Sequence, residues 1–101
     1  MAKDPIRHAH GDRFAEQRYR IGRAIAGIRL WRDLTQEGLE RATGIDVTRL
    51  SRIERGLLNT GVNTYIRIAD GLHVPLHWLF TEDWPQYIGD VPGSPSHPPA
   101  T

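Results

Sequence analysis

The sequence predicts an all-α fold of five short helices, and three kinds of observation support that prediction. Between residues 12 and 80, apolar residues recur every three or four positions, which is the spacing of the buried face of a helix. Residues that favour helix N-caps and glycines that favour helix ends divide this stretch into separate segments. From residue 84 onward, prolines, glycines and serines replace the helical pattern.

Residues 12–33 predict the first and longest helix. One apolar stripe with helical spacing runs along it, formed by Phe14, Ile21, Ile25, Ile28 and Trp31. Residues 1–11 show no such periodicity, so we expect them to form a flexible, disordered N-terminal arm.

Residues 34–56 predict two further helices joined by one tight turn. Thr35 suits the N-cap of the first of these helices, and Gly44 suits the left-handed backbone that ends it. Asp46 suits the N-cap of the second, and Gly56 suits its C-terminal stop. With Leu50 and Ile53 turned inward, the helical period presents the opposite side of this helix to solvent, namely residues 47, 48, 51, 52 and 55.

A fourth helix over about residues 62–72 and a short fifth helix complete the prediction. Thr60 or Gly61 caps the fourth, whose apolar face holds Val62, Tyr65 or Ile66, Ile68, Ala69 and Leu72. Pro75 opens the fifth, with its inward side formed by Leu76, Leu79 and Phe80.

We expect one domain over residues 12–83, with the two-helix unit at 35–56. An aromatic and then Pro/Gly/Ser-rich tail over 84–101 should carry no helix or strand and be disordered from residue 90.

Composition excludes several classes of protein. The 101 residues include no cysteine, so disulfides and cysteine-ligated zinc are impossible. No apolar run is long enough to span a membrane, and no signal peptide is evident, so we expect a cytoplasmic protein without a membrane partner. No nucleophile context or glycine-rich phosphate loop is present, which predicts no enzymatic activity, no cofactor and no small-molecule substrate. His73 and His77 have the spacing of helical metal ligands, but Pro75 intervenes without an evident third ligand, so no metal site is predicted.

Charge is distributed unevenly along the chain. Residues 1–67 hold all 13 lysines and arginines against eight acidic residues, a net charge of +5, whereas residues 68–101 have a net charge of −4. This asymmetry favours a polyanionic partner for the first two thirds of the chain. The alternative is a solvated surface followed by a mildly acidic tail.

Together these segments resemble the Cro/C1-type helix-turn-helix family (XRE family), the DNA-binding domain of phage repressors and many small bacterial regulators. The resemblance runs from about residue 21 to residue 80. It rests on Ile21-Gly22, Ile25 with Arg29, Leu34-Thr35-Gln36-Glu37, Gly44, Arg52-Ile53-Glu54-Arg55-Gly56, and the stretch from Ile68 to Phe80. It implies a lambda-repressor-like domain of five helices that binds double-stranded DNA.

The third helix is then the recognition helix. Its exposed residues that would meet base edges are Val47, Thr48, Ser51 and Arg52. Arg52 can donate two hydrogen bonds to guanine, and the methyl groups of Val47 and Thr48 suit thymine. The alternative for Arg52 is a contact with phosphate or solvent.

The same resemblance implies contacts with the DNA backbone on both sides of the recognition helix. The predicted phosphate ligands are Thr35, Gln36, Arg49, Arg55, Asn59 and Thr60. For Asn59 and Thr60, an ordinary solvated surface is the alternative. Arg29 and Glu54 resemble an internal ion pair of the family, with a structural role.

Two residues depart from the family pattern. Glu40 stands where the family usually has an alanine packed between the second and third helices, and Gly38 weakens the second helix. The fold should tolerate both, since Arg41 or Arg49 could pair with Glu40.

The expected function is a sequence-specific transcriptional regulator, most simply a repressor that binds a palindromic operator as a homodimer. The alternative is a protein-interaction module or an antitoxin that uses the same fold, with the tail contacting a protein. Trp78, Trp84 and Tyr87 either pack back on the domain or form a dimer surface. We expect residues 76–88 and the fourth helix to contribute to the homodimer.

Overall fold

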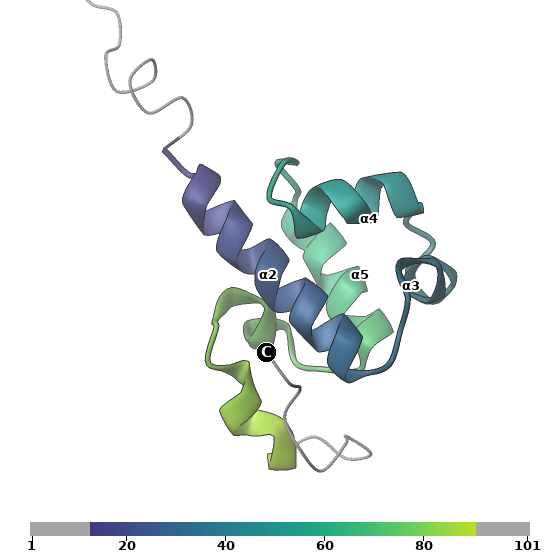
Figure 1. Cartoon of the computed structure of the whole chain (residues 1–101), viewed down its shortest axis with the longest axis vertical. Helices are drawn as coiled ribbons and strands as arrows, with labels where there is room; N and C mark the ends of the chain where they lie inside the picture. Colours follow the sequence, from purple (N-terminus) through teal and green to yellow (C-terminus); the bar gives the residue numbers. More distant parts are fainter. Residues whose placement is uncertain (1–12, 91–101) are drawn as a thin grey trace, which may run out of the picture.

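A computed structural model describes residues 13–90 of the chain (Figure 1). This part contains four α-helices and two 3₁₀ helices, without a strand: α2 (Ala15–Trp31), α3 (Gln36–Thr43), α4 (Val47–Glu54), α5 (Val62–Leu72), η1 (Leu76–Phe80) and η2 (Trp84–Asp90). The predicted all-α fold is confirmed. The predicted arm at 1–11 and the end of the predicted tail, 91–101, lie outside the described residues. None of the described helices is long and apolar enough to cross a membrane.

The predicted boundaries of the central helices are confirmed by their caps. Thr35 Oγ1 accepts a hydrogen bond of 2.9 Å from the backbone N–H of Gly38 at the start of α3. Asp46 Oδ1 accepts one of 2.8 Å from the backbone N–H of Arg49 at the start of α4. Gly44 ends α3 with φ 76°, the left-handed backbone that favours glycine and allows the sharp turn into α4.

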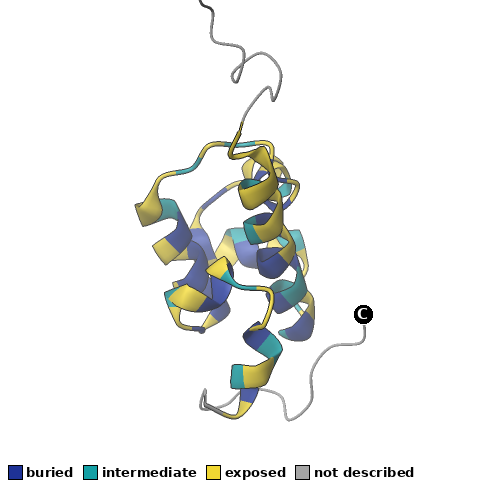
Figure 2. Cartoon of the chain, turned by 90° about the vertical axis from the view of Figure 1, so that its left-hand side faces the viewer, coloured by how far each residue is buried: buried dark blue, intermediate teal, exposed yellow. Residues whose placement is uncertain are grey.

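The long helix α2 organises the molecule. In Figure 1, α3, α4 and α5 lie along one side of α2, and η2 lies on the other. The side chains between these elements form one hydrophobic core, whose fully buried members include Ile25, Ile28, Leu39, Leu50 and Ile68. Figure 2 shows buried positions on the inner sides of the helices and exposed ones on the outside.

Three residues expected on apolar inner faces are exposed instead. Phe14 is the N-cap of α2. It precedes Gly22, where the backbones of α2 and α4 lie close together, by more than one helical turn and is exposed. Val62 is the first residue of α5, and Phe80 the last of η1. Because η1 has three residues per turn, Leu76 and Leu79 share a face that Phe80 does not, and Trp78 is buried in its place.

The expectation that no helix or strand follows residue 84 is wrong for residues 84–90. These residues form η2, and Trp84 and Ile88 belong to the core. The ring of Trp84 lies 5.7 Å from that of Trp31 and 5.8 Å from that of Trp78. Pro85 is tolerated because it follows the first residue of the helix, where a backbone N–H is not required. Of the two alternatives for the aromatic residues, packing against the domain therefore holds for Trp78 and Trp84, and the half-buried Tyr87 also packs against the core.

Candidate nucleic-acid interface

The outward side of α4 is the surface that the sequence predicted to read DNA bases. Leu50 and Ile53 fix the orientation of the helix, since both are buried in the core. The structure brings the four predicted base-contacting residues to the opposite side: Thr48 and Arg52 are exposed, and Val47 and Ser51 are half-buried. Residues 47 and 48 lie one helical turn before residues 51 and 52, so all four side chains share one side of the helix.

Thr43 holds the turn between α3 and α4. Its hydroxyl donates a hydrogen bond of 2.7 Å to the carbonyl oxygen of Leu39 and accepts one of 3.1 Å from the backbone N–H of Ile45. The sequence left open whether Ala42 or Thr43 faces inward, and the structure buries Thr43 and exposes Ala42. A threonine before the terminal glycine of a helix was the signal for this role, because its hydroxyl can reach both the last turn and the chain that leaves it.

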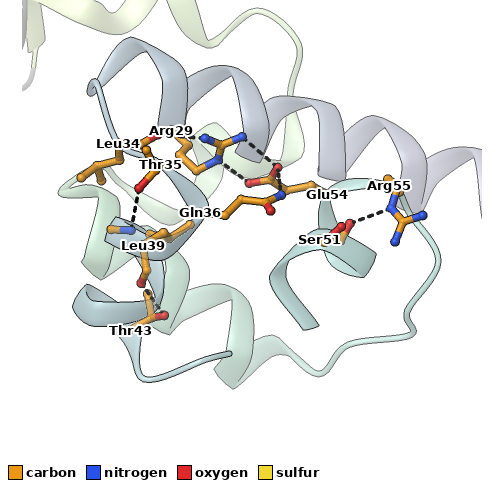
Figure 3. A network of polar contacts seen from close by, with 10 residues as sticks. Arg29, Leu34, Thr35, Gln36, Leu39, Thr43, Ser51, Glu54 and Arg55 are labelled. Atoms are coloured by element: carbon orange, nitrogen blue, oxygen red, sulfur yellow. Dashed lines mark hydrogen bonds and ion pairs between the residues drawn. The ribbon is translucent and has the colours of Figure 1, made fainter. Parts of the chain in front are cut away.

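A buried ion pair joins α2 to the end of the recognition helix (Figure 3). Arg29 Nε donates to Glu54 Oε2 over 2.7 Å, and Arg29 Nη2 donates to Glu54 Oε1 over 3.2 Å. The third nitrogen, Nη1, donates to the carbonyl oxygen of Leu34 over 2.8 Å. The two side chains are only 12 % and 5 % exposed, so each charge depends on the other for compensation.

Gln36 extends this network into the first turn of α3. Its Nε2 donates to Glu54 Oε1 over 3.0 Å, as Figure 3 shows. From its place in the sequence, Gln36 was predicted only as a phosphate ligand, without this bond. No motif signals it, because the bond depends on how the start of α3 lies against the end of α4.

The backbones of α2 and α4 approach each other closely at Gly22. A Cβ atom at this position would overlap the carbonyl oxygen of Glu54 and lie 2.5 Å from that of Ile53. Any larger residue would therefore push α4 away from α2. Close packing at Gly22 and the ion pair of Arg29 together fix where α4 ends.

Beyond α4, the predicted phosphate ligands lie on an exposed loop. Arg55 is exposed, and its Nε donates to the carbonyl oxygen of Ser51 over 3.3 Å. Asn59 is also exposed, whereas Thr60 is half-buried with a hydroxyl oxygen that is inaccessible and has no hydrogen-bond partner. Of the remaining predicted phosphate ligands, Thr35 uses its side chain to cap α3, and Arg49 is exposed on α4.

The predicted pairing of Glu40 is wrong. Within residues 13–90, the ion pairs are Arg20 with Glu16 and Arg29 with Glu54, and neither Arg41 nor Arg49 reaches Glu40. Glu40 is half-buried on α3, where water can solvate its carboxylate. In the same part of the chain, no three histidine, aspartate or glutamate side chains gather as metal ligands.

Comparison with known families identifies the class of protein that this fold and surface define. The helix-turn-helix family model HTH_3 matches residues 25–79, more than half of the chain. The chain belongs to this family of DNA-binding transcription regulators, and its fold is that of the Cro/C1-type domain.

Solved structures of similar fold include regulators from several sources. The restriction-modification controller protein C.AhdI from Aeromonas hydrophila has a TM-score of 0.63 and 25 % identity over 64 % of this chain and 98 % of its own. The controller protein C.Esp1396I, solved as a tetramer with its natural 35 base-pair operator, has a TM-score of 0.59 and 31 % identity over 63 % and 84 %. The hypothetical transcription factor NHTF from Neisseria gives 0.62 and 26 % over 64 % and 75 %. A search of curated proteins finds no match.

Proposed function

We propose that this protein is a repressor that binds an inverted-repeat DNA sequence as a homodimer, in the cytoplasm and without catalysis. One observation carries the proposal. The side of α4 that is free of the core presents two hydroxyl-bearing residues and Arg52 beside the methyl groups of Val47 and Thr48. These groups complement base edges in the major groove, where the first residues of a recognition helix lie.

Around this side of α4, three segments carry polar or charged groups that could bind DNA phosphates, namely the start of α3, α4 with Arg55, and the loop before α5. Gln36 and Thr35 open α3, where free amides and the helix dipole favour a phosphate. Arg49 on α4 and Arg55 after it supply charge, and Asn59 is exposed on the loop that leads into α5. The hydroxyl of Thr60 is inaccessible, so this residue has only its backbone to offer a phosphate. In this division, these residues fix the position of the domain on DNA, and Val47, Thr48, Ser51 and Arg52 choose the sequence.

The homodimer is supported by an apolar surface that α5 and η1 share. Val62 and Ile66 lie one turn apart on α5 and are 58 % and 41 % exposed. Phe80 is 48 % exposed, and its ring packs edge-on against Tyr65 of α5 at 5.7 Å. Exposed apolar side chains gathered in this way favour contact with another protein surface. A second copy is the occupant that inverted-repeat binding requires, because a two-fold dimer uses the same surface on both subunits.

Selection of bound duplexes from random DNA tests the function. The expected product is an inverted repeat whose half-sites are separated by about one helical turn, roughly 34 Å. Its affinity should fall steeply with salt because phosphate contacts release counterions. Recovery of no preferred sequence would overturn the proposal in favour of a protein-interaction module. With the selected site placed over a reporter promoter, repression predicts lower expression when the protein is present.

Sedimentation tests the dimer. Ile66→Glu places a charge in the shared apolar surface and should convert the dimer to monomers at micromolar concentration. Arg67→Glu, at the next and more polar position of α5, is the matched control and should sediment as the parent does. A monomeric parent protein, with or without the selected DNA, would overturn the homodimer.

A further inference from the structure

Gln36 faces two demands on one side-chain amide. As a phosphate ligand at the start of α3, it must offer an N–H group, since a phosphate oxygen only accepts hydrogen bonds. In the structure, however, its Nε2 already donates to Glu54 Oε1 over 3.0 Å.

The orientation of that amide is fixed by its partner. The Glu54 carboxylate only accepts hydrogen bonds, so the nitrogen of Gln36, and not its oxygen, must face it. Glu54 cannot turn away to release it, because the same carboxylate is buried and held by Nε and Nη2 of Arg29. Figure 3 shows Gln36 reaching this carboxylate from the first turn of α3.

An amide nitrogen has two hydrogens, and the bond to Glu54 uses one of them. We propose that Gln36 is a positioning residue whose Nε2 bridges a DNA phosphate and Glu54, so that backbone contact by α3 is tied to the end of the recognition helix. The inference rests on the proposed function. Arg29 compensates the charge of Glu54 at 2.7 Å, so this buried carboxylate does not oppose a phosphate nearby.

Bridging and simple phosphate binding by Gln36 predict different results. A residue that only binds phosphate lowers affinity for every sequence by the same factor when it is removed. A bridging residue also fixes the end of α4, where Arg52 lies one residue before Ile53 and two before Glu54. Its removal should therefore reduce the discrimination between correct and incorrect bases as well as the affinity.

The test uses Gln36→Met, which keeps the length of the side chain and removes both hydrogens. We expect the ratio of affinities for the selected duplex and for single-base variants of it to fall by about threefold to tenfold. Asn59→Ala, an exposed proposed phosphate ligand outside the network, is the matched control and should lower affinity with that ratio unchanged. Melting temperatures of both variants establish that they are folded.

An unchanged ratio in Gln36→Met, with the parent protein selecting a defined sequence, would overturn the bridge and leave the proposed function intact. Failure of the parent to select any sequence would overturn both.

A second measurement needs no variant. Nitrogen-15 NMR should show one side-chain hydrogen of Gln36 held by Glu54 in the free protein and the other shifting when the selected duplex is added. Loss of the Glu54 bond on adding DNA would contradict the bridge.

Discussion

Two regions pack against opposite sides of α2, and they are held by different interactions. On one side, the unit of α3 and α4 depends on single directional bonds, such as the cap of Thr35 and the ion pair of Arg29 with Glu54. On the other side, η2 is held by a cluster of rings in which Trp84 contacts Trp31 of α2 and Trp78 of η1. The first region fixes the orientation of α4 through bonds to its own residues, whereas the second adds buried area through its rings.

This difference separates stability from specificity. A change among the rings should lower the free energy of unfolding and leave the preferred DNA sequence as it was. A change in the directional bonds should act on the position of α4 as well.

Glu54→Ala should have the largest effect. It leaves the guanidinium of Arg29 buried without its partner, and the expected loss in the free energy of unfolding is about 3–5 kcal/mol. Chemical denaturation measures this loss, with Glu37→Ala on exposed α3 surface as the control that should stay within about 0.5 kcal/mol. Equal melting temperatures for Glu54→Ala and the parent would show that the ion pair is not structural.

Trp84→Ala should cost about 3 kcal/mol, because it removes a buried indole from between two other rings. Denaturation of the variant measures the cost, and Gln86→Ala, exposed on the same 3₁₀ helix, should be nearly neutral. The sequence that Trp84→Ala selects from random DNA should match that of the parent. A changed preference would mean that the two sides of α2 are not independent.

Thr43→Val should cost about 2 kcal/mol, since it keeps the shape of the side chain and leaves the buried N–H of Ile45 unsatisfied. Thr43→Ser keeps the hydroxyl and loses only a methyl group, so it should be the more stable of the two variants in urea. The reverse order would show that packing, and not the hydrogen bonds, holds the turn.

Thr35→Ala should have the smallest effect, about 1 kcal/mol, through loss of the cap on Gly38. Thr35→Ser preserves the hydroxyl and should melt close to the parent. A serine variant as unstable as the alanine variant would exclude capping as the cause.

The same comparison explains how much was predictable from sequence. The helix-turn-helix unit was readable because its caps, its glycine turn and the inward residues of α4 each obey local rules. The ring cluster was not, because the burial of Trp84 and Ile88 depends on α2 and η1 lying beneath them. Phe80 was misplaced because a 3₁₀ helix has a different period from an α-helix. The bond from Gln36 to Glu54 joins two helices whose relative position no local pattern encodes.

The central claim is that the outward side of α4 reads DNA sequence. The base preference at the position that Arg52 contacts tests this claim most directly. The measurement is selection from random duplexes with the parent and with Arg52→Ala. The account predicts an inverted repeat for the parent and, for the variant, the same repeat with the preference relaxed at one position in each half-site. A variant that selects the parent's sequence with uniformly weaker binding would contradict it, because Arg52 would then hold the DNA backbone and not a base.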